Sequence, residues 1–315
     1  MTGQPPGTAL QEAAPASPAA TVGNPLHGVG LMLGSTLLFA AMHASIRHLS
    51  ADLHPFEMAF FRNVFGLLFV VPWIVRYGLV LLRTERIGLH LVRTAFNLMA
   101  MLSFFYALSI TPLSEVTALG FTAPIFTTVL AVLVLREVVG PRRWAAIAIG
   151  FVGTLIILRP GFHEVGTGQL LTLFSSLAWA CALMAIKTLS RTESSVTIIA
   201  YMGLLMIPAS LVPAVFVWQW PVGAQWWWLL AIGLLGGAGQ LCMTEALKQA
   251  DTSVVMPIDF CKLIWVAVIA YLAFGEIPGL YTWLGGAVIF SSTMYIAYRE
   301  QSRARPVRTP LQTPG

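Results

Sequence analysis

Two residues of opposite charge, Asp259 and Lys262, stand three positions apart in an otherwise apolar stretch of the sequence. Residues at i and i+3 share one face of a helix, so their side chains are expected to meet. Ionisable groups at membrane depth are costly unless they pair or face a wet cavity. The pair is therefore either a neutral structural element or part of a site that binds a charged or zwitterionic solute or relays a proton.

Three further ionisable residues fit the same chemistry. Arg62 and Glu115 stand near the same expected end of two apolar stretches, where an Arg–carboxylate bridge is geometrically allowed. Such a bridge would either close that side of the protein or contact a solute. His43 lies in the middle of an apolar stretch and titrates near neutral pH, as a hydrogen-bonded packing residue or as a functional group.

Three aromatic residues, Tyr106, Trp179 and Trp265, are expected to lie deep among the helices, where they pack or stack on a flat or cationic ligand. No catalytic residue, metal ligand or cofactor is predicted, because the sequence lacks the HExxH, GxSxG, DDxxD and Walker motifs. The aromatic residues complete a candidate substrate-binding set with Asp259, Lys262, His43, Arg62 and Glu115.

Helices must position these residues. Hydrophobic residues make up 57% of the 315 residues and charged residues 10%, whereas a soluble domain carries about 25% charged residues. Apolar stretches of about 20 residues, enough to cross the core of a bilayer, recur along the sequence. The sequence predicts an all-α membrane protein with ten transmembrane helices, at about 28–49, 56–75, 88–109, 112–135, 142–159, 166–188, 194–216, 226–248, 252–274 and 278–298.

The basic residues predict how these helices are oriented. With both ends of the chain in the cytoplasm, fourteen of the 18 basic residues fall on the inner side, and Arg47 and Arg159 fall on the outer side. The net charge of +5 is then an orientation signal and a contact with anionic lipids, not a nucleic-acid footprint. Residues 1–26 are predicted to be a disordered cytoplasmic tail and residues 299–315 a basic cytoplasmic tail.

The sequence also repeats itself. An offset of 139 residues places Glu137 on Glu276, and an offset of 140 places Arg47 on Lys187. Because each half holds an odd number of helices, the second half is expected to be inverted relative to the first. Inverted repeats are typical of transporters that work by alternating access. The expected units are residues 27–160 and 164–298, each with five helices.

Two motifs, Phe60-Phe61-Arg62-Asn63 and Thr111-Pro112-Leu113-Ser114-Glu115, resemble the drug/metabolite transporter superfamily and in particular its EamA family. The resemblance covers about residues 28–300. It implies two inverted five-helix repeats, a central cavity lined mainly by the first four helices of each half, and no chemical change to the substrate. Asp259 and Lys262 interrupt a helix that is expected to be apolar in this family, which indicates a polar specialisation.

The sequence thus predicts a secondary transporter of the bacterial inner membrane. Its substrate is expected to be a small polar or amphipathic metabolite, amino-acid-derived or S-adenosylmethionine-like, because the Arg62 motif and the segment after Thr111 look most like family members with that label. Alternatives are an exporter of amino acids or drug-like compounds, a riboflavin-type uptake carrier and, in another class, an intramembrane enzyme. The expected partners are this small molecule and membrane lipids, with proton or counter-substrate coupling left open, and no nucleic acid.

Overall fold

The computed structural model describes residues 25–69, 71, 84–135, 140–161, 164–190, 192–193, 195–249 and 252–304. Within these ranges the chain forms helices joined by short connections, without a β-strand, as the sequence predicts. The helices are α1 (Pro25–Leu49), α2 (Pro55–Gly66), the 3-10 helix η1 (Leu67–Phe69), α4 (Ile87–Ile110), α5 (Leu113–Gly120), α6 (Ala123–Leu135), α7 (Pro141–Leu158), α8 (Thr167–Leu189), α9 (Ser195–Val215), α10 (Gln225–Gln249), α11 (Thr252–Asp259), α12 (Cys261–Phe274) and α13 (Leu280–Ala304).

Many of these helices have the length and composition of membrane spans. Two shorter apolar stretches, Trp144–Leu158 and Ala200–Val215, fall in the predicted fifth and seventh spans. The total of ten spans stays a prediction, and the end of the predicted second span lies outside the described residues. Among the described residues, the six segments that are long and apolar enough to cross a membrane are Leu26–Leu49, Ile87–Ile110, Leu113–Val134, Thr167–Leu189, Gln225–Leu247 and Pro257–Phe274.

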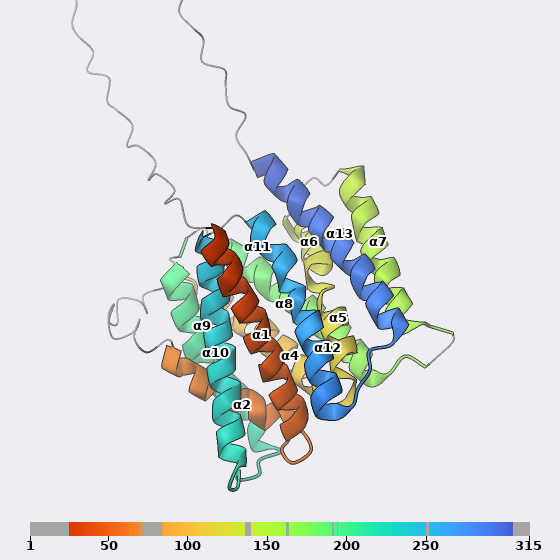
Figure 1. The fold of residues 1–315 in the computed structure, drawn as a ribbon. Coiled ribbons are helices and arrows are strands. Elements are labelled where there is room, and N and C mark those ends of the chain that lie inside the picture. Colours follow the sequence, from red (N-terminus) through yellow and green to blue (C-terminus); the bar gives the residue numbers. More distant parts are fainter. Residues whose placement is uncertain are drawn as a thin grey trace, which may run out of the picture.

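The first and last helices extend beyond the predicted spans. α1 begins at Pro25, because the fixed φ of proline suits the first position of a helix. α13 continues past Tyr298 to Ala304, through a run of Arg, Glu, Gln and Ala residues that favour helix. The start of α1 and the end of α13 lie at the same end of the bundle (Figure 1). The rest of the two predicted tails, 1–24 and 305–315, lies outside the described residues.

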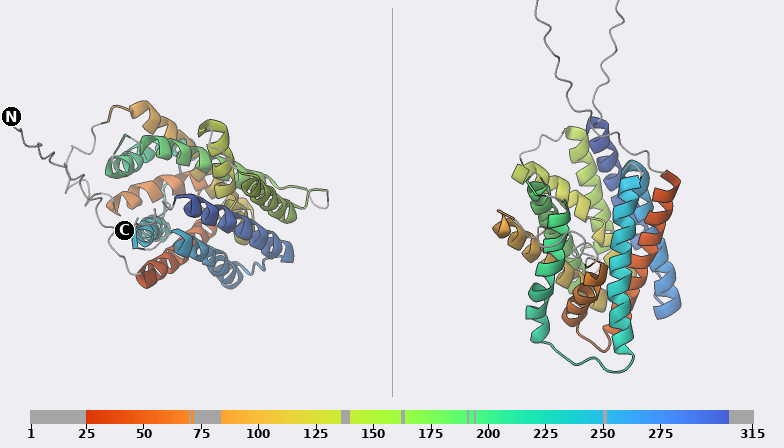
Figure 2. Two further views of the ribbon diagram at one scale, coloured as in Figure 1. Left: turned by 90° about the horizontal axis from the view of Figure 1, so that it is seen from above. Right: turned by 90° about the vertical axis from the view of Figure 1, so that its left-hand side faces the viewer.

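Helices from the two halves of the chain pack mainly against each other. The most extensive contacts join α1 to α10, α4 to α8 and α7 to α13, and α2 also packs on α9. The pairing of α7 with α13 is visible both from the side and from above (Figures 1 and 2). Neither half therefore forms a core on its own, because each apolar helix face in these pairs is covered by a helix of the other half.

The predicted fourth and ninth spans are each interrupted, and the interruptions fall at matching positions. α5 ends before Phe121 and α6 begins after Thr122, while Phe260 separates α11 from α12. The two phenylalanines are 139 residues apart, the same offset that relates the two halves of the sequence. Their rings stack with centroids 4.0 Å apart and planes at 17°. The two interruptions therefore meet inside the bundle.

Proline chemistry explains the first interruption. Pro124 lacks the N–H that would bond to the Gly120 carbonyl, and the residue before a proline disfavours helical geometry. The hydroxyl of Ser176 on α8 lies 3.5 Å from the Gly120 carbonyl oxygen and donates to it. At the second interruption, which follows Pro257 of α11, the Phe260 N–H bonds to the Pro257 carbonyl at 3.3 Å in a local turn. Side chains and local turns thus satisfy carbonyl groups that would otherwise be unpaired.

α7 and α13 approach each other through facing glycines. A Cβ atom added at Gly153 would lie 2.9 Å from the Gly285 carbonyl oxygen, and one added at Gly285 would lie 2.5 Å from the Gly153 carbonyl oxygen. Both contacts involve backbone atoms, so neither helix can yield without moving as a whole. The crossing therefore requires glycine at both positions.

We predict that Gly153→Ala lowers stability by about 1–3 kcal/mol, because the methyl group forces α7 away from α13. Gly34→Ala in α1 is the matched control, since a Cβ at Gly34 meets no atom within 4 Å. The apparent Tm of each purified variant measures the effect. An unchanged Tm for Gly153→Ala would show that the two helices separate freely.

Candidate substrate site

The residues predicted from sequence as a charged pair lie at the interruption between α11 and α12. Asp259 is the last residue of α11 and Lys262 the second residue of α12. The Lys262 Nζ lies 3.6 Å from the Asp259 Oδ1, and the side chains are 18% and 23% exposed. The i, i+3 pairing predicted for a continuous helix therefore survives the interruption. At this distance and exposure the two groups form a loose ion pair that a ligand can rearrange.

Lys262 also contacts the stacked phenylalanines. Its Nζ lies 4.9 Å from the centre of the Phe121 ring, within cation–π range. Phe260 packs in turn on Phe290, with ring centroids 3.8 Å apart. The ammonium group thus sits between one carboxylate and an aromatic surface, an arrangement that suits a ligand with both charged and flat parts.

His43 faces the same region from α1. It is 8% exposed, and its ring lies 5.1 Å from the ring of Phe104 on α4. Lys262 and Arg62 both lie within electrostatic range of its imidazole. The Nδ1 atom is buried without a hydrogen-bond partner. A buried imidazole nitrogen without a partner is costly, so a ligand or water is the natural complement.

Arg62 reaches this region from α2. Its Nη1 donates to the Asn63 Oδ1 at 3.2 Å, and the Asn63 Nδ2 donates to the Ser210 hydroxyl of α9 at 3.1 Å. A Cβ at Gly236 of α10 would lie 3.2 Å from the Arg62 Nε, so glycine there makes room for the guanidinium. Three helices therefore fix the orientation of Arg62.

Trp265 lies one turn beyond Lys262 on α12. It packs against the buried apolar cluster that includes Met42 and Val266. Its indole Nε1 is buried without a hydrogen-bond partner. We call the five residues His43, Arg62, Asp259, Lys262 and Trp265 the central polar cluster. All five were predicted as candidates from the sequence.

Three other predicted candidates lie elsewhere. The Glu115 Oε2 accepts a hydrogen bond from the Gln169 Nε2 of α8 at 2.9 Å. The ring of Tyr106 lies 5.9 Å from that of His54, next to the connection between α1 and α2. Trp179 is 38% exposed on the surface of α8. These three residues therefore do not join the central polar cluster.

The predicted Arg62–Glu115 bridge is wrong. Arg62 is bonded to Asn63 and Glu115 to Gln169, and no ion pair joins the two described side chains. The prediction assumed that similar depth in the membrane implies proximity. Depth does not specify the direction in which a side chain leaves its helix, and the two point toward different neighbours.

The ion pair that does form joins Arg47 to Glu276. Their Nη2 and Oε1 atoms lie 3.0 Å apart. The Arg47 Nη1 also donates to the carbonyl oxygens of Leu108 and Ser109 at the end of α4, at 3.1 and 2.7 Å. The Glu276 Oε2 accepts the N–H of Leu113 at the start of α5, at 2.9 Å. One ion pair thus caps two helix ends and joins both halves of the chain.

This ion pair is not predicted from the sequence, although a signal is present. The repeat matches Arg47 with Lys187 and Glu276 with Glu137, and does not by itself pair Arg47 with Glu276 across the two halves. The matching positions are Lys187 and Glu137, and the latter lies outside the described residues. A basic residue at the end of the first helix of each half, with a glutamate at the end of the fourth, was the available clue.

A second buried basic group also escaped the sequence analysis. Arg93 is 5% exposed and donates to the Ile198 carbonyl of α9 at 3.2 Å. Its neighbour His90 stacks on Tyr201, with ring centroids 4.4 Å apart. The charge distribution places Arg93 on the inner side, and Arg93 lies within both the predicted span 88–109 and α4. The Arg93 side chain therefore holds α4 against α9.

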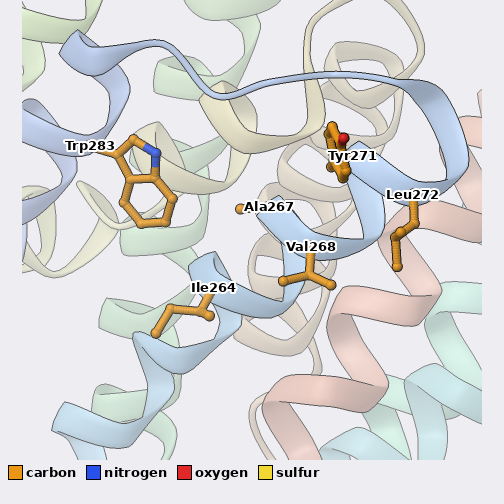
Figure 3. A pocket seen from close by; sticks show the side chains of 6 residues that line it. All are labelled: Ile264, Ala267, Val268, Tyr271, Leu272 and Trp283. Carbon is orange, nitrogen blue, oxygen red and sulfur yellow. The ribbon is translucent and has the colours of Figure 1, made fainter.

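An open apolar groove of about 350 Å³ lies between α12 and α13 (Figure 3). Its wall includes Leu272, which is 76% exposed, and Trp283, which is 40% exposed. The other lining residues are Ile264, Ala267, Val268 and Tyr271. An exposed and almost wholly apolar surface suits contact with lipid chains, so this groove does not extend the polar site.

The comparison with protein families agrees with the arrangement of helices and polar groups. The model of the EamA-like transporter family matches residues 26–159 and again residues 166–298. The chain belongs to the EamA-like transporter family. Membership makes it a transporter rather than an enzyme, and with its six long apolar helices it is a multi-pass membrane protein.

Curated relatives of this EamA-like transporter carry different substrate names. The S-adenosylmethionine uptake transporter of Rickettsia bellii is 30% identical, over 87% of this chain and 94% of the relative. The riboflavin transporter of Vibrio cholerae is 32% identical, over 90% of this chain and 97% of the relative. The pseudopaline exporter of Pseudomonas aeruginosa is 27% identical, over 83% of this chain and 93% of the relative. These names agree on transport and differ on the solute.

A solved crystal structure shares the fold of this EamA-like transporter. The two structures superpose with a TM-score of 0.59, covering 89% of this chain and 99% of the other. Their sequences are 16% identical, so the likeness concerns the fold alone. Among the described residues, no group of three His, Cys, Asp or Glu side chains is arranged to hold a metal ion.

We predict that the Asp259–Lys262 pair of this transporter contributes under about 1 kcal/mol to stability, because partly exposed ion pairs are weak. Lys262→Met and Asp259→Asn should each leave the apparent Tm nearly unchanged. A double-mutant cycle of Tm values measures the coupling. If the single variants lose several kcal/mol and the double variant recovers it, the pair is instead a dry structural element.

Proposed function

We propose that this EamA-like transporter is a secondary carrier that moves a small polar or amphipathic metabolite across the bacterial cytoplasmic membrane. The single observation that carries the proposal is the central polar cluster at the meeting point of two interrupted helices. Interrupted helices are the usual place of substrate sites in secondary transporters. The favoured solute is amino-acid-derived or S-adenosylmethionine-like, in line with the name of the relative from Rickettsia bellii.

The chemistry of the cluster supports such a solute. Asp259 can pair with an ammonium or sulfonium group, and Lys262 with a carboxylate. The Phe121 and Phe260 rings offer a flat surface for a heterocycle. Riboflavin is the second candidate, favoured by the same stacked rings and by the name of the relative from Vibrio cholerae.

The proposed architecture is ten membrane spans in two inverted repeats, with both termini in the cytoplasm. The matching interruptions at Phe121 and Phe260 support it, as do the helix pairs formed between the two halves. The shared end of the bundle at which α1 begins and α13 ends supports an even number of crossings (Figure 1). The boundaries at residues 27–160 and 164–298 belong to this proposal.

Alternating access assigns a role to the Arg47–Glu276 ion pair. It lies at the end of the bundle opposite the start of α1, the side that the charge distribution assigns to the outside. Because it ties α1, α4 and α5 to the loop after α12, this side can open only when the pair breaks. The ion pair is thus the outer gate of the proposed cycle.

Counterflow in proteoliposomes tests the carrier. Vesicles loaded with unlabelled S-adenosylmethionine are expected to accumulate labelled S-adenosylmethionine transiently, because exchange through one site is faster than net flux. Riboflavin is tested in the same way. Lys262→Met should abolish the signal, whereas Phe174→Leu on the exposed surface of α8 should keep it. Uptake of both solutes equal to that of protein-free vesicles would refute these substrates.

The gate makes a separate prediction. In a variant without native cysteines, Thr111→Cys reports opening, because Thr111 is 6% exposed beside the ion pair. Adding Glu276→Gln should raise its labelling by a membrane-impermeant maleimide about 5-fold or more, as the closed state loses its cap. Glu115→Gln is the matched control, since Glu115 contacts α8 instead. Equal labelling with Glu276→Gln would exclude a gating role.

A further inference from the structure

The central polar cluster carries an imbalance of charge. Within the described ranges it holds two basic side chains, Arg62 and Lys262, and one carboxylate, Asp259, which already pairs with Lys262. Neither described carboxylate on α2 or α10, Glu57 or Glu245, forms an ion pair with Arg62. The Glu57 Oε2 accepts the N–H of Gln219 at 3.2 Å while its Oε1 is buried without a hydrogen-bond partner, and Glu245 accepts from the Gln249 side chain at 3.1 Å. Arg62 is therefore left without a negative partner.

The unpaired groups of the cluster are mainly hydrogen-bond donors. A guanidinium has five N–H groups, and only the bond from Nη1 to Asn63 is made by Arg62 to a described residue. The buried indole N–H of Trp265 can only donate. Arg62 is partly exposed, so its remaining donors can reach a solute, while the buried Trp265 donor costs free energy unless a ligand supplies an acceptor.

The surroundings of Arg62 are built to hold it in place. Asn63 is itself fixed by Ser210, whose hydroxyl donates to the Met206 carbonyl at 2.6 Å. Gly236 of α10 leaves room for the Arg62 guanidinium, because a Cβ there would lie 3.2 Å from the Arg62 Nε and 2.8 Å from the Met42 Sδ. A planar, oriented guanidinium is the group that binds a carboxylate or phosphate through two parallel hydrogen bonds.

We infer that Arg62 binds an acidic group of the transported solute, a carboxylate or a phosphate, while the Asp259–Lys262 pair and the phenylalanine rings hold the rest of it. This inference rests on the proposed carrier function and narrows its substrate class. It requires an acid on the solute, so S-adenosylmethionine fits through its α-carboxylate, and riboflavin fits only when it carries a phosphate. The acid neutralises Arg62 at the point where the two halves of the chain meet.

Matched solute pairs test the inference and separate the two kinds of acid. One pair is S-adenosylmethionine and its decarboxylated form; the other is flavin mononucleotide and riboflavin. We expect the acidic member of at least one pair to bind about 10- to 100-fold more tightly than its neutral partner, the effect of a charged hydrogen-bonded contact. Thermal-shift titration of the purified full chain gives the apparent Kd values. Equal affinities within every pair that binds would overturn the inference while leaving the carrier function intact.

Two variants show whether Arg62 causes the preference. Arg62→Gln should bring the acidic and neutral members to equal affinity, and Arg62→Lys should keep part of the preference because the charge remains. Arg93→Gln is the matched control, since Arg93 is an arginine inside the bundle that contacts α9 instead. A preference that survives in Arg62→Gln, or is lost equally in Arg93→Gln, would refute the assignment.

A solute-independent measurement covers the case in which none of the four compounds binds. Phenylglyoxal modifies arginine side chains, and peptide mass spectrometry locates the modification. We expect Arg62 to be modified in proteoliposomes and acetate to slow this reaction several-fold, without slowing modification of Arg142 on the exposed start of α7. Protection then upholds the acid site even where counterflow refutes the named substrates. Absence of modification, or of protection by acetate, would overturn it.

Discussion

Backbone groups inside an apolar medium must find partners within the protein, and this constraint governs the fold. Continuous helices satisfy it without help, whereas each interruption leaves carbonyl groups that need another donor. Two helices are interrupted, at Phe121 and at Phe260, and nearby groups supply donors to backbone carbonyls at each interruption. Ser176 of α8 reaches the Gly120 carbonyl at the first interruption, and a turn pairs Phe260 with Pro257 at the second. The free-energy cost of unpaired backbone groups is tolerated at an interruption that contributes to a functional site.

The two interruptions bring together groups that the rest of the bundle keeps apart. Phe121 and Phe260 stack on each other, and the Lys262 ammonium lies over the Phe121 ring. Asp259 and Lys262 remain partly exposed and loosely paired, so they are not sealed as a structural element. Weak pairing suits a carrier, because the side chains of its site must exchange partners each time a solute binds and leaves.

The contrast with Arg47 and Glu276 makes this point clearer. These side chains meet at 3.0 Å, and each also bonds to backbone at a helix end. Pro112 gives α5 no side-chain cap of its own, so Glu276 supplies it from the other half of the chain. A negative charge at the start of a helix and a positive charge at the end of another both suit the helix dipoles. The firm ion pair holds one end of the bundle, and the loose one remains available to a solute.

The sequence by itself determined what depends on local spacing and composition. It predicted the all-helical class, because apolar stretches of bilayer length leave no other backbone solution, and it predicted the contact of Asp259 with Lys262, because i and i+3 are neighbours on any helix. Only the tertiary structure decided which helices face each other. The Arg47–Glu276 pair spans 229 positions, and the Arg62–Glu115 bridge does not form although the sequence predicts a similar depth for both residues. The rotation of each helix about its axis is set by many weak packing contacts, such as Gly236 against Arg62, and no short pattern in the sequence records their sum.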